Sequence, residues 1–328
     1  MFGSKILLTT YSTAFLTSGG GESELVQVAE ILNKSGLQAD IYGIGSRPLD
    51  YYEYVIHFSL HQDGESIIKE ATKKQKKIIL WPNVWWMNPP SISEVNRIFD
   101  LLESVKILIF KSKTELLHFN SYIQLKKTKC KYAVIPIGIS DRFLLPVDNE
   151  VLSFFCDIKN YIICLGLIEP VKNQLRLIKA LNILKKNALF IGGYRDNEYF
   201  NLCLKEAHSG IHFLPFVQPC SVFLRSAIAN ATLLAEPSFD PPGRSAIEGA
   251  FMGKPLVLSE GPWQREYFGD GAWYVNPTSE DSIADGIKSV LSDPNKEAIV
   301  NVTASLIRSK NSSNVVSQKL IETILEIS

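Results

Sequence analysis

The chain has 328 residues, of which 46% are hydrophobic and 21% charged, with 34 lysines and arginines balanced by 34 aspartates and glutamates. This composition excludes a disordered or fibrous protein, and the zero net charge gives no electrostatic reason to expect nucleic acid as a partner. At roughly 100 to 200 residues per domain, the length favours two domains.

The cysteines and the hydropathy pattern indicate a cytoplasmic protein. Five cysteines occur without a C-x-x-C pair, which argues against zinc and structural disulfides and favours a reducing compartment. The N-terminal apolar run is short and continues as a strand pattern, and no segment approaches the roughly 18 apolar residues of a membrane span.

Apolar runs of strand length alternate with helical patterns through both halves of the chain, which is typical of a parallel sheet covered by helices. In the first half we expect a helix over residues 22–35 and strands over residues 5–10, 39–44, 54–58, 77–81, 105–110 and 132–137. In the second half the expected strands cover residues 161–167, 188–193, 211–214, 231–238, 255–260 and 272–277.

The alternation is interrupted between residues 138 and 158, where Gly138, Pro146 and several acidic residues occur. We therefore predict an N-terminal domain over residues 1–145 and a C-terminal domain over residues 158–311. The helix of residues 312–328 could pack on either domain, and we expect it to pack back on the first. The expected fold class is α/β, with two doubly wound Rossmann-like domains facing each other across a cleft.

A glycine-rich loop follows the first strand and leads directly into a helix. Gly19, Gly20 and Gly21 allow close backbone approach, and the free N–H groups of a helix start favour an anion or a polar sugar. The spacing does not fit G-x-G-x-x-G, and a simple flexible turn is the alternative.

The second domain opens on "CLGLIEPVKNQLRLIKAL", in which a strand ends at Gly166 and a helix is expected near Val171. Lys172 then lies in the first helical turn, where a cation opposes the helix dipole unless a polyanion binds there. The alternative is a lysine on a solvated helix face.

Further along the chain, "FDPPGRSAIEGAFMG" places a prolyl turn between a strand and a helix expected from about Ser245. Asp240 and Glu248 can both reach one cleft, where carboxylates suit acid/base chemistry or recognition of sugar hydroxyls. For Glu248 the alternative is capping of the helix whose N-cap is Arg244 or Ser245.

These segments resemble the GT-B glycosyltransferases, in particular the retaining family 4 within the glycosyl transferases group 1. The run "DPPGRSAIEGAFMGKPLVLSE" is similar to that family's donor-site signature of two glutamates separated by seven residues, with Asp240 in the place of the first. The segments "SGGGESELVQVAEILNKSGLQADIYG", "VIPIGISDRF" and "GLIEPVKNQLRLIKAL" resemble further family motifs in the same order.

The resemblance implies a role for each matching residue. Glu248 would bind the ribose, Asp240 the hydroxyls of the donor sugar, and Lys172 the diphosphate. The remaining implied nucleotide-sugar contacts are Gly20, Gly21, Gly166, Asn173, Gly243, Arg244 and Ser245. No metal is implied, because cationic side chains and helix N-termini stabilise the leaving diphosphate in such enzymes.

Three positions depart from the family pattern. Leu167 stands where an arginine usually follows the glycine of the pyrophosphate motif, and Arg244 is a candidate substitute for that cation. Asp240 is one methylene shorter than the usual glutamate. In place of a cleft histidine, the segment "IILWPNVWW" offers Pro82 or Asn83.

Histidines and tryptophans of the first half add weaker candidates. His57 and His61 follow a strand expected to open on the cleft, so His57 is a catalytic candidate, with a structural histidine as the alternative. Trp81, Trp85 and Trp86 either stack on sugar rings or anchor a long loop.

The leading hypothesis is a transferase that moves a sugar from a UDP- or GDP-type donor to a glycan or lipid-linked acceptor, with retention, in cell-surface polysaccharide or glycoconjugate synthesis. Lysines at 73–77 and 126–131 would suit a peripheral contact with the inner membrane face, although solvated lysines are the default. The alternatives are a catalytically weak module that binds a nucleotide sugar or supports a partner enzyme, and a GT-B sugar-nucleotide epimerase.

Overall fold

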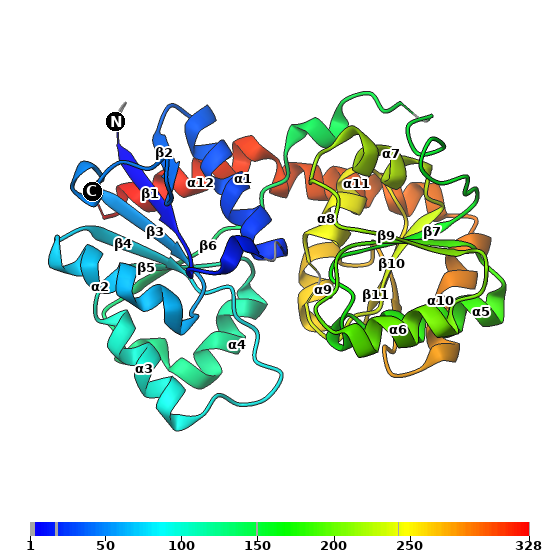
Figure 1. The fold of residues 1–328 in the computed structure, drawn as a ribbon, viewed down its shortest axis with the longest axis horizontal. Helices are drawn as coiled ribbons and strands as arrows, with labels where there is room; N and C mark the ends of the chain where they lie inside the picture. Colours follow the sequence, from blue (N-terminus) through cyan, green and yellow to red (C-terminus); the bar gives the residue numbers. More distant parts are fainter. Residues whose placement is uncertain (1–3, 17–18, 149, 242, 328) are drawn as a thin grey trace. The chain divides into compact units, whose positions relative to one another are not determined.

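The computed structural model describes residues 4–16, 19–148, 150–241 and 243–327. The chain forms two compact units, one of Met1–Gly138 with Asn311–Ser328 and one of Ile139–Lys310 (Figure 1). The division thus falls earlier than the sequence boundary between residues 145 and 158. The reason is that Arg225 Nη1 donates hydrogen bonds to the carbonyl oxygens of Leu145, at 2.9 Å, and Pro146, at 3.2 Å, which ties this segment to the second unit.

The first unit is built on a six-stranded parallel sheet with the order β2-β1-β3-β4-β5-β6. Its strands are β1 (Lys5–Thr9), β2 (Gln38–Ile41), β3 (Tyr54–Phe58), β4 (Lys77–Trp81), β5 (Val105–Phe110) and β6 (Lys131–Val134). Its helices are α1 (Gly20–Lys34), α2 (Glu65–Lys73), α3 (Ile92–Leu102), α4 (Lys113–Ile123) and α12 (Ser313–Leu325).

Alternation along the strands places two hydrophobic cores on the two faces of this sheet. Ile6 and Leu8 of β1 point into the core that α1 and α12 cover, whereas Leu7 points into the core of α2, α3 and α4. Burial on both faces explains why these strands read as continuous apolar runs in the sequence.

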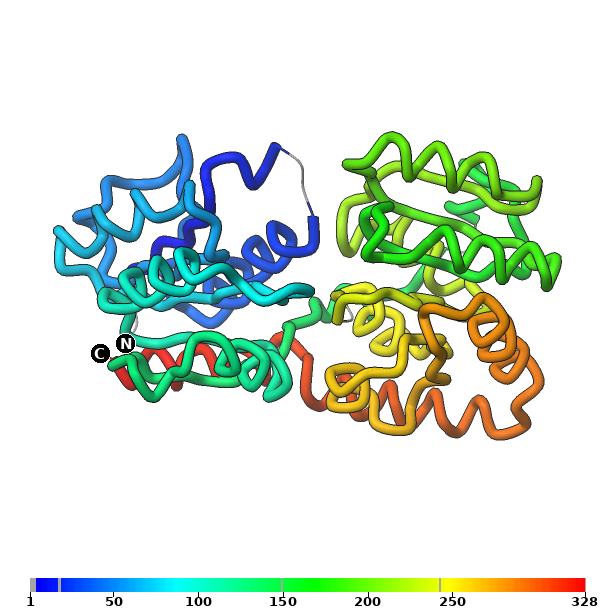
Figure 2. The backbone as a smooth tube through the Cα atoms, turned by 90° about the horizontal axis from the view of Figure 1, so that it is seen from below, coloured from blue at the N-terminus to red at the C-terminus, as the bar shows by residue number. Residues whose placement is uncertain are grey.

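The C-terminal helix lies on the first unit rather than on the second. Val316, Leu320 and Ile324 of α12 are buried in the same core as Leu25 and Leu32 of α1. Figure 2 shows this last segment, in red, running back along the N-terminal unit. A segment that is distant in sequence therefore completes the first core.

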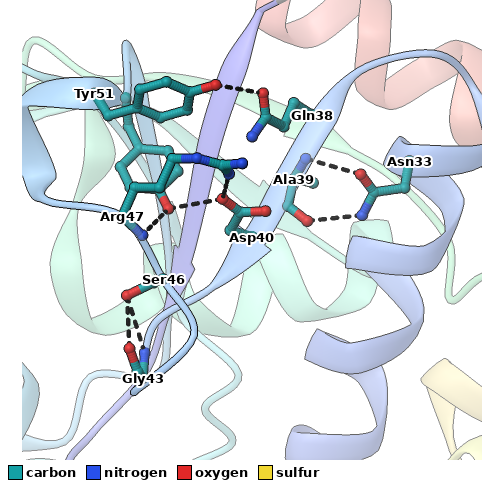
Figure 3. A network of polar contacts seen from close by, with 9 residues as sticks. Asn33, Gln38, Ala39, Asp40, Gly43, Ser46, Arg47 and Tyr51 are labelled. Atoms are coloured by element: carbon teal, nitrogen blue, oxygen red, sulfur yellow. Dashed lines mark hydrogen bonds and ion pairs between the residues drawn. The ribbon is translucent and has the colours of Figure 1, made fainter.

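Polar side chains protect β2, the edge strand of the first sheet (Figure 3). The Asn33 side chain accepts from the Ala39 amide at 3.0 Å and donates to the Ala39 carbonyl at 2.7 Å, so it satisfies backbone groups of the edge. Beyond the strand, Asp40 Oδ2 accepts from Arg47 Nη1 and from the Tyr52 hydroxyl, both at 2.8 Å. These contacts fix the loop that follows β2.

The second unit contains another six-stranded parallel sheet, with the order β12-β11-β10-β7-β8-β9. Its strands are β7 (Ile162–Leu165), β8 (Ala188–Ile191), β9 (Ile211–Leu214), β10 (Leu233–Glu236), β11 (Leu256–Ser259) and β12 (Trp273–Val275). Its helices are α5 (Gln174–Leu184), α6 (Asn197–Glu206), α7 (Val222–Asn230), α8 (Arg244–Phe251), α9 (Pro262–Phe268), α10 (Glu280–Ser292) and α11 (Lys296–Asn311). Helices α5, α6 and α10 cover one face, and α7 and α8 lie on the other (Figure 1).

The α/β prediction is confirmed, and each expected strand is present. Four strands have the predicted bounds, at 54–58, 77–81, 105–110 and 211–214. The others are shorter, as where residues 42–46 form a turn closed by hydrogen bonds between Ser46 and Gly43 instead of extending β2. None of the described helices is long and apolar enough to span a membrane.

Candidate functional site

The order of the second sheet defines a point where a ligand can bind. Strands β7 and β10 are neighbours, but the chain continues from β7 toward β9 on one side and from β10 toward β12 on the other. In open parallel sheets, ligands bind outside the carboxyl ends of the strands at such a reversal. The segments that follow these two strands form what we call the switch-point site, made of Gly166, Glu169, Lys172, Glu236, Asp240, Gly243, Arg244, Ser245 and Glu248.

Glycines shape the β7 side of this site. Gly166 has φ +123°, a backbone conformation that side-chain-bearing residues rarely adopt. A Cβ on the neighbouring Gly192 would lie 1.9 Å from the Gly166 carbonyl oxygen, so both positions require glycine. The chain can therefore turn tightly at the end of β7.

Lys172 lies in a short 3₁₀ turn, Pro170–Lys172, and not in the first turn of the α-helix, which begins at Gln174. Its Nζ is 2.6 Å from Asp240 Oδ2, which follows β10. Burial by itself lowers the pKa of Lys172, but the attraction of Asp240, Glu236 and Glu169 outweighs it and the pKa is raised. Lys172 is therefore a firmly charged cation among carboxylates, not a lysine on a solvated helix face.

A second ion pair lies on α8. Glu248 Oε1 accepts from Arg244 Nε at 3.2 Å and Nη2 at 3.0 Å, and both residues are buried. The alternative that Glu248 caps the helix is wrong, because α8 begins at Arg244 with Gly243 as its N-cap and Glu248 lies in the second turn. The charge of Arg244, proposed to replace the arginine missing at Leu167, is already balanced by Glu248.

The start of α8 is instead held by Glu236, the last residue of β10. Its carboxylate accepts from the Gly243 amide at 3.1 Å and from the Ser245 hydroxyl at 2.6 Å. Burial raises the pKa of Glu236, against the opposing effects of Lys172, Ser245 and Gly243. The prolyl turn before the helix includes Pro242, which lies outside the described residues.

Two polar atoms of the switch-point site, Asp240 Oδ1 and Arg244 Nη1, are buried and have no hydrogen-bond partner among the described residues. An unpaired buried polar atom typically costs about 1–3 kcal/mol, so such atoms call for a ligand or water. One is an acceptor and the other a cationic donor. The site is thus suited to a ligand with both hydroxyl and anionic groups.

Asn173, expected to contact a nucleotide sugar, is a structural residue in this fold. It is 2% exposed, and its Nδ2 donates to the carbonyl oxygens of Pro237, at 2.8 Å, and Pro277, at 2.7 Å. Its Oδ1 accepts from Arg176 Nη1 at 3.1 Å. These hydrogen bonds occupy the polar atoms of the Asn173 side chain and join the segments that carry Asn173, Pro237 and Pro277. The expected contact with a ligand is therefore wrong for this side chain.

In the first unit, α1 begins at Gly20, as the glycine-rich loop suggested. Glu22 fixes this end, because its carboxylate accepts from the Gly19 amide at 2.8 Å and from the Tyr11 hydroxyl at 2.9 Å. A Cβ at Gly20 would meet nothing within 4 Å, and one at Gly21 would lie 3.7 Å from Asn83 Nδ2. Residues 17 and 18 of the loop lie outside the described residues.

His57 lies in the core, and its catalytic assignment needs correction. It is 1% exposed, and its Nδ1 is hydrogen-bonded to Thr9 Oγ1 at 2.8 Å. Burial lowers its pKa to about 4. A neutral imidazole without access to solvent matches the structural alternative, whereas His61 is exposed and its ring lies tilted against Tyr11, with centroids 4.9 Å apart.

The three tryptophans do not form one surface. Trp81 ends β4, is 1% exposed and stacks on Phe58 in the core. Trp85 stacks on His118 of α4 with ring centroids 3.8 Å apart, and the Trp86 amide donates to His118 Nε2 at 3.1 Å. The loop is thus anchored through His118, a residue that sequence reasoning missed because it lies on a different element.

Glu236 and Glu22 were also not identified from the sequence as residues that fix helix starts. A glutamate at the end of an otherwise apolar strand, as in "TLLAEPS", was the available signal for Glu236. Glu22 gave only the ordinary signal of an acidic residue in a first helical turn. Within the described residues, no group of three or more histidine, cysteine, aspartate or glutamate side chains is placed to hold a metal ion.

Comparisons with solved structures identify the fold. Anabaena HepE in complex with UDP and glucose has a TM-score of 0.77 at 15% identity, over 98% of this chain and 100% of that one. Sucrose-phosphate synthase from Thermosynechococcus elongatus has a TM-score of 0.78 at 12% identity, over 98% and 99%. A glycosyltransferase from Rickettsia africae has a TM-score of 0.75 at 17% identity, over 99% and 98%.

The two parallel sheets and these neighbours define the class of the fold: the chain has the GT-B fold of the glycosyltransferases that it resembles. Residues 155–304 match the family described as glycosyl transferases group 1, and this part of the chain contains the switch-point site. No curated protein sequence matches the chain.

Proposed function

We propose that the protein transfers a sugar from a UDP-sugar, with retention of configuration, to a glycan or lipid-linked acceptor in cell-surface polysaccharide or glycoconjugate synthesis. The observation that carries this proposal is the partly buried ion pair Lys172–Asp240 beside the buried ion pair Arg244–Glu248, at the switch point of a group 1 domain. UDP is favoured because HepE is described in complex with UDP and with UDP-glucose.

In this proposal the bound nucleotide sugar replaces a protein carboxylate as the partner of a cation. The diphosphate replaces Asp240 as a partner of Lys172. Asp240 then accepts hydrogen bonds from hydroxyls of the transferred sugar, which supply a hydrogen-bond donor to its Oδ1. Glu248 contacts the ribose, while Arg244 keeps its hydrogen bonds to the Glu248 carboxylate. Preorganised charges of this kind stabilise a leaving diphosphate in a water-poor site.

The charges of the switch-point site support a specific course for the reaction. We infer that the leaving diphosphate accepts the proton of the acceptor hydroxyl on the same face of the sugar, which gives retention. Neutralisation by Lys172 and by the amide end of α8 takes the place of a metal ion, so the rate should not change when EDTA is added.

On the acceptor side, a peripheral contact of the first unit with an anionic membrane remains part of the proposal. Its support is the exposure of lysines near residues 73–77, although Lys74 is engaged by Asp50 at 2.8 Å. Polybasic segments gain roughly 1 kcal/mol per cation near such a surface.

The test is an assay of free nucleoside diphosphate after incubation with UDP-, GDP-, ADP- and dTDP-sugars, with and without lipid-linked acceptors. We expect release of UDP, and at least about a tenfold loss in Lys172→Ala, because one charge-assisted contact is worth about 1.5–3 kcal/mol. Lys179→Ala is the matched control, since Lys179 forms a surface ion pair with Glu280 on the same unit.

The result also separates the alternatives. Binding of nucleotide sugars without release under any condition would favour a non-catalytic binding module. Neither binding nor release with any donor would show that the proposed function is wrong.

A further inference from the structure

We propose that Glu236 is a positioning residue for the nucleotide sugar, which sets the start of α8 by accepting hydrogen bonds from the Gly243 amide and the Ser245 hydroxyl. This inference rests on the proposed function, because Gly243 and Ser245 are positioned for the diphosphate only if the switch-point site binds a nucleotide sugar. Glu236 itself is 4% exposed, and its two carboxylate oxygens are occupied by Gly243 and Ser245.

The two ends of the loop between β10 and α8 are held in different ways. The near end is fixed by backbone and neutral contacts: Asn173 Nδ2 bonds to the Pro237 carbonyl, the Ser259 hydroxyl to the Ser238 carbonyl at 2.6 Å, and the Phe239 amide to the Val171 carbonyl at 2.8 Å. The far end, at Gly243 and Ser245, is held by the carboxylate of Glu236.

Each carboxylate oxygen of Glu236 accepts from a different hydrogen-bond donor. Oε1 accepts from the Gly243 amide, and Oε2 accepts from the Ser245 hydroxyl. A carboxylate at the amide end of a helix is favoured by the helix dipole, and hydrogen bonds to a charged acceptor are stronger than neutral ones. Glutamine has no charge and only one acceptor oxygen, so it can accept from the Gly243 amide but can meet the Ser245 hydroxyl only by donating to it.

Glu236 also interacts electrostatically with other residues of the switch-point site. Lys172 faces it from the 3₁₀ turn, Asp240 from the loop, and the Cys164 thiol from β7, in addition to Ser245 and the Gly243 amide. Because Arg244 and Glu248 lie on the helix that Glu236 anchors, a shift at its start would move the groups proposed to contact diphosphate and ribose together.

The experiment is calorimetric titration of UDP into the full-length protein, because one titration reports the dissociation constant and the fraction of competent molecules separately. We expect Glu236→Ala to raise the dissociation constant for UDP about tenfold or more with the stoichiometry retained, since it removes two charge-assisted hydrogen bonds. Glu236→Gln and Ser245→Ala, which each spare one contact, should show intermediate losses.

A merely structural role would give the opposite pattern, in which the competent fraction falls and the dissociation constant stays the same. Glu260→Gln is the matched control, because Glu260 follows the neighbouring strand β11 but pairs with Arg265 on the surface. If Glu236→Ala does not fold, Glu236→Gln carries the test, because it leaves Ser245 in place.

Unchanged UDP affinity, within twofold, in Glu236→Ala or in Ser245→Ala would overturn this inference while leaving the proposed function intact. Failure of the unmodified protein to bind any nucleotide sugar would instead overturn the proposed function, and this inference with it.

Discussion

At the scale of single residues, Arg244 is the position whose interpretation changed most. The sequence suggested a free cation that replaces the arginine missing at Leu167, but the structure pairs Arg244 with Glu248, and Nη1 has no partner in the described part of the chain. Its main effect should therefore be to hold Glu248. The two roles make different predictions.

We expect Arg244→Ala to weaken binding of UDP and of uridine alike, because it leaves the Glu248 carboxylate buried without its cation. Removal of one partner of a buried ion pair typically costs about 3–5 kcal/mol of stability, so thermal unfolding should also shift down. Arg265→Ala, which breaks an exposed ion pair with Glu260, is the control. A loss confined to UDP, with uridine binding unchanged, would restore the role as a diphosphate ligand.

His57 provides a prediction for the pH dependence of stability. Its pKa is lowered by burial from the ordinary 6.5 to about 4, so the unfolded chain binds the proton more tightly. Stability from this group is present above about pH 6.5 and is lost as the pH falls toward 4, by roughly 3 kcal/mol.

Urea unfolding between pH 4 and 7 measures this effect. His57→Gln should flatten the pH dependence in that window relative to the unmodified protein, whereas His61→Gln, at an exposed histidine, should not. An identical slope in His57→Gln would show that His57 is not the group that titrates.

At the scale of elements, the sequence predicted strands well and their connections less well. Strands β3, β4, β5 and β9 have the predicted bounds because continuous apolar runs bounded by polar residues are a strong local signal. The turn at Pro170–Lys172 was expected as the start of α5. Its conformation depends on Asn173, whose partners lie far along the chain.

Asn173 should therefore matter for stability. Its left-handed backbone (φ 63°) and its bonds to Pro237 and Pro277 join three loops at the carboxyl edge of the second sheet. We expect Asn173→Ala to destabilise the protein by roughly 2–4 kcal/mol in urea unfolding, as two buried carbonyls lose their donor. Asn160→Ala, at an exposed residue with φ 51°, controls for backbone strain alone, and an equal loss in both would reject the role of the side chain.

At the scale of the whole molecule, the chain crosses to the second unit and returns, so that its last helix completes the first core. Leu320 on α12 is fully buried there. Leu320→Ala should destabilise the first unit by about 2–5 kcal/mol, as expected for a buried leucine, in thermal unfolding followed by hydrogen exchange of β1 and β3. Leu325→Ala, at a half-exposed position of the same helix, should have a much smaller effect; comparable losses would argue against docking of α12 as a core element.

The amino-acid sequence alone determined the α/β class, the two sheets and the segments that end at the switch point, because hydrophobic periodicity and glycine positions act locally. Tertiary structure alone decided which charges meet: Lys172 with Asp240, 68 positions apart, and Glu236 with the start of α8. The physical reason is that a side chain's role depends on its burial and on the groups that face it. Both are set by the sheet order, which no local pattern encodes.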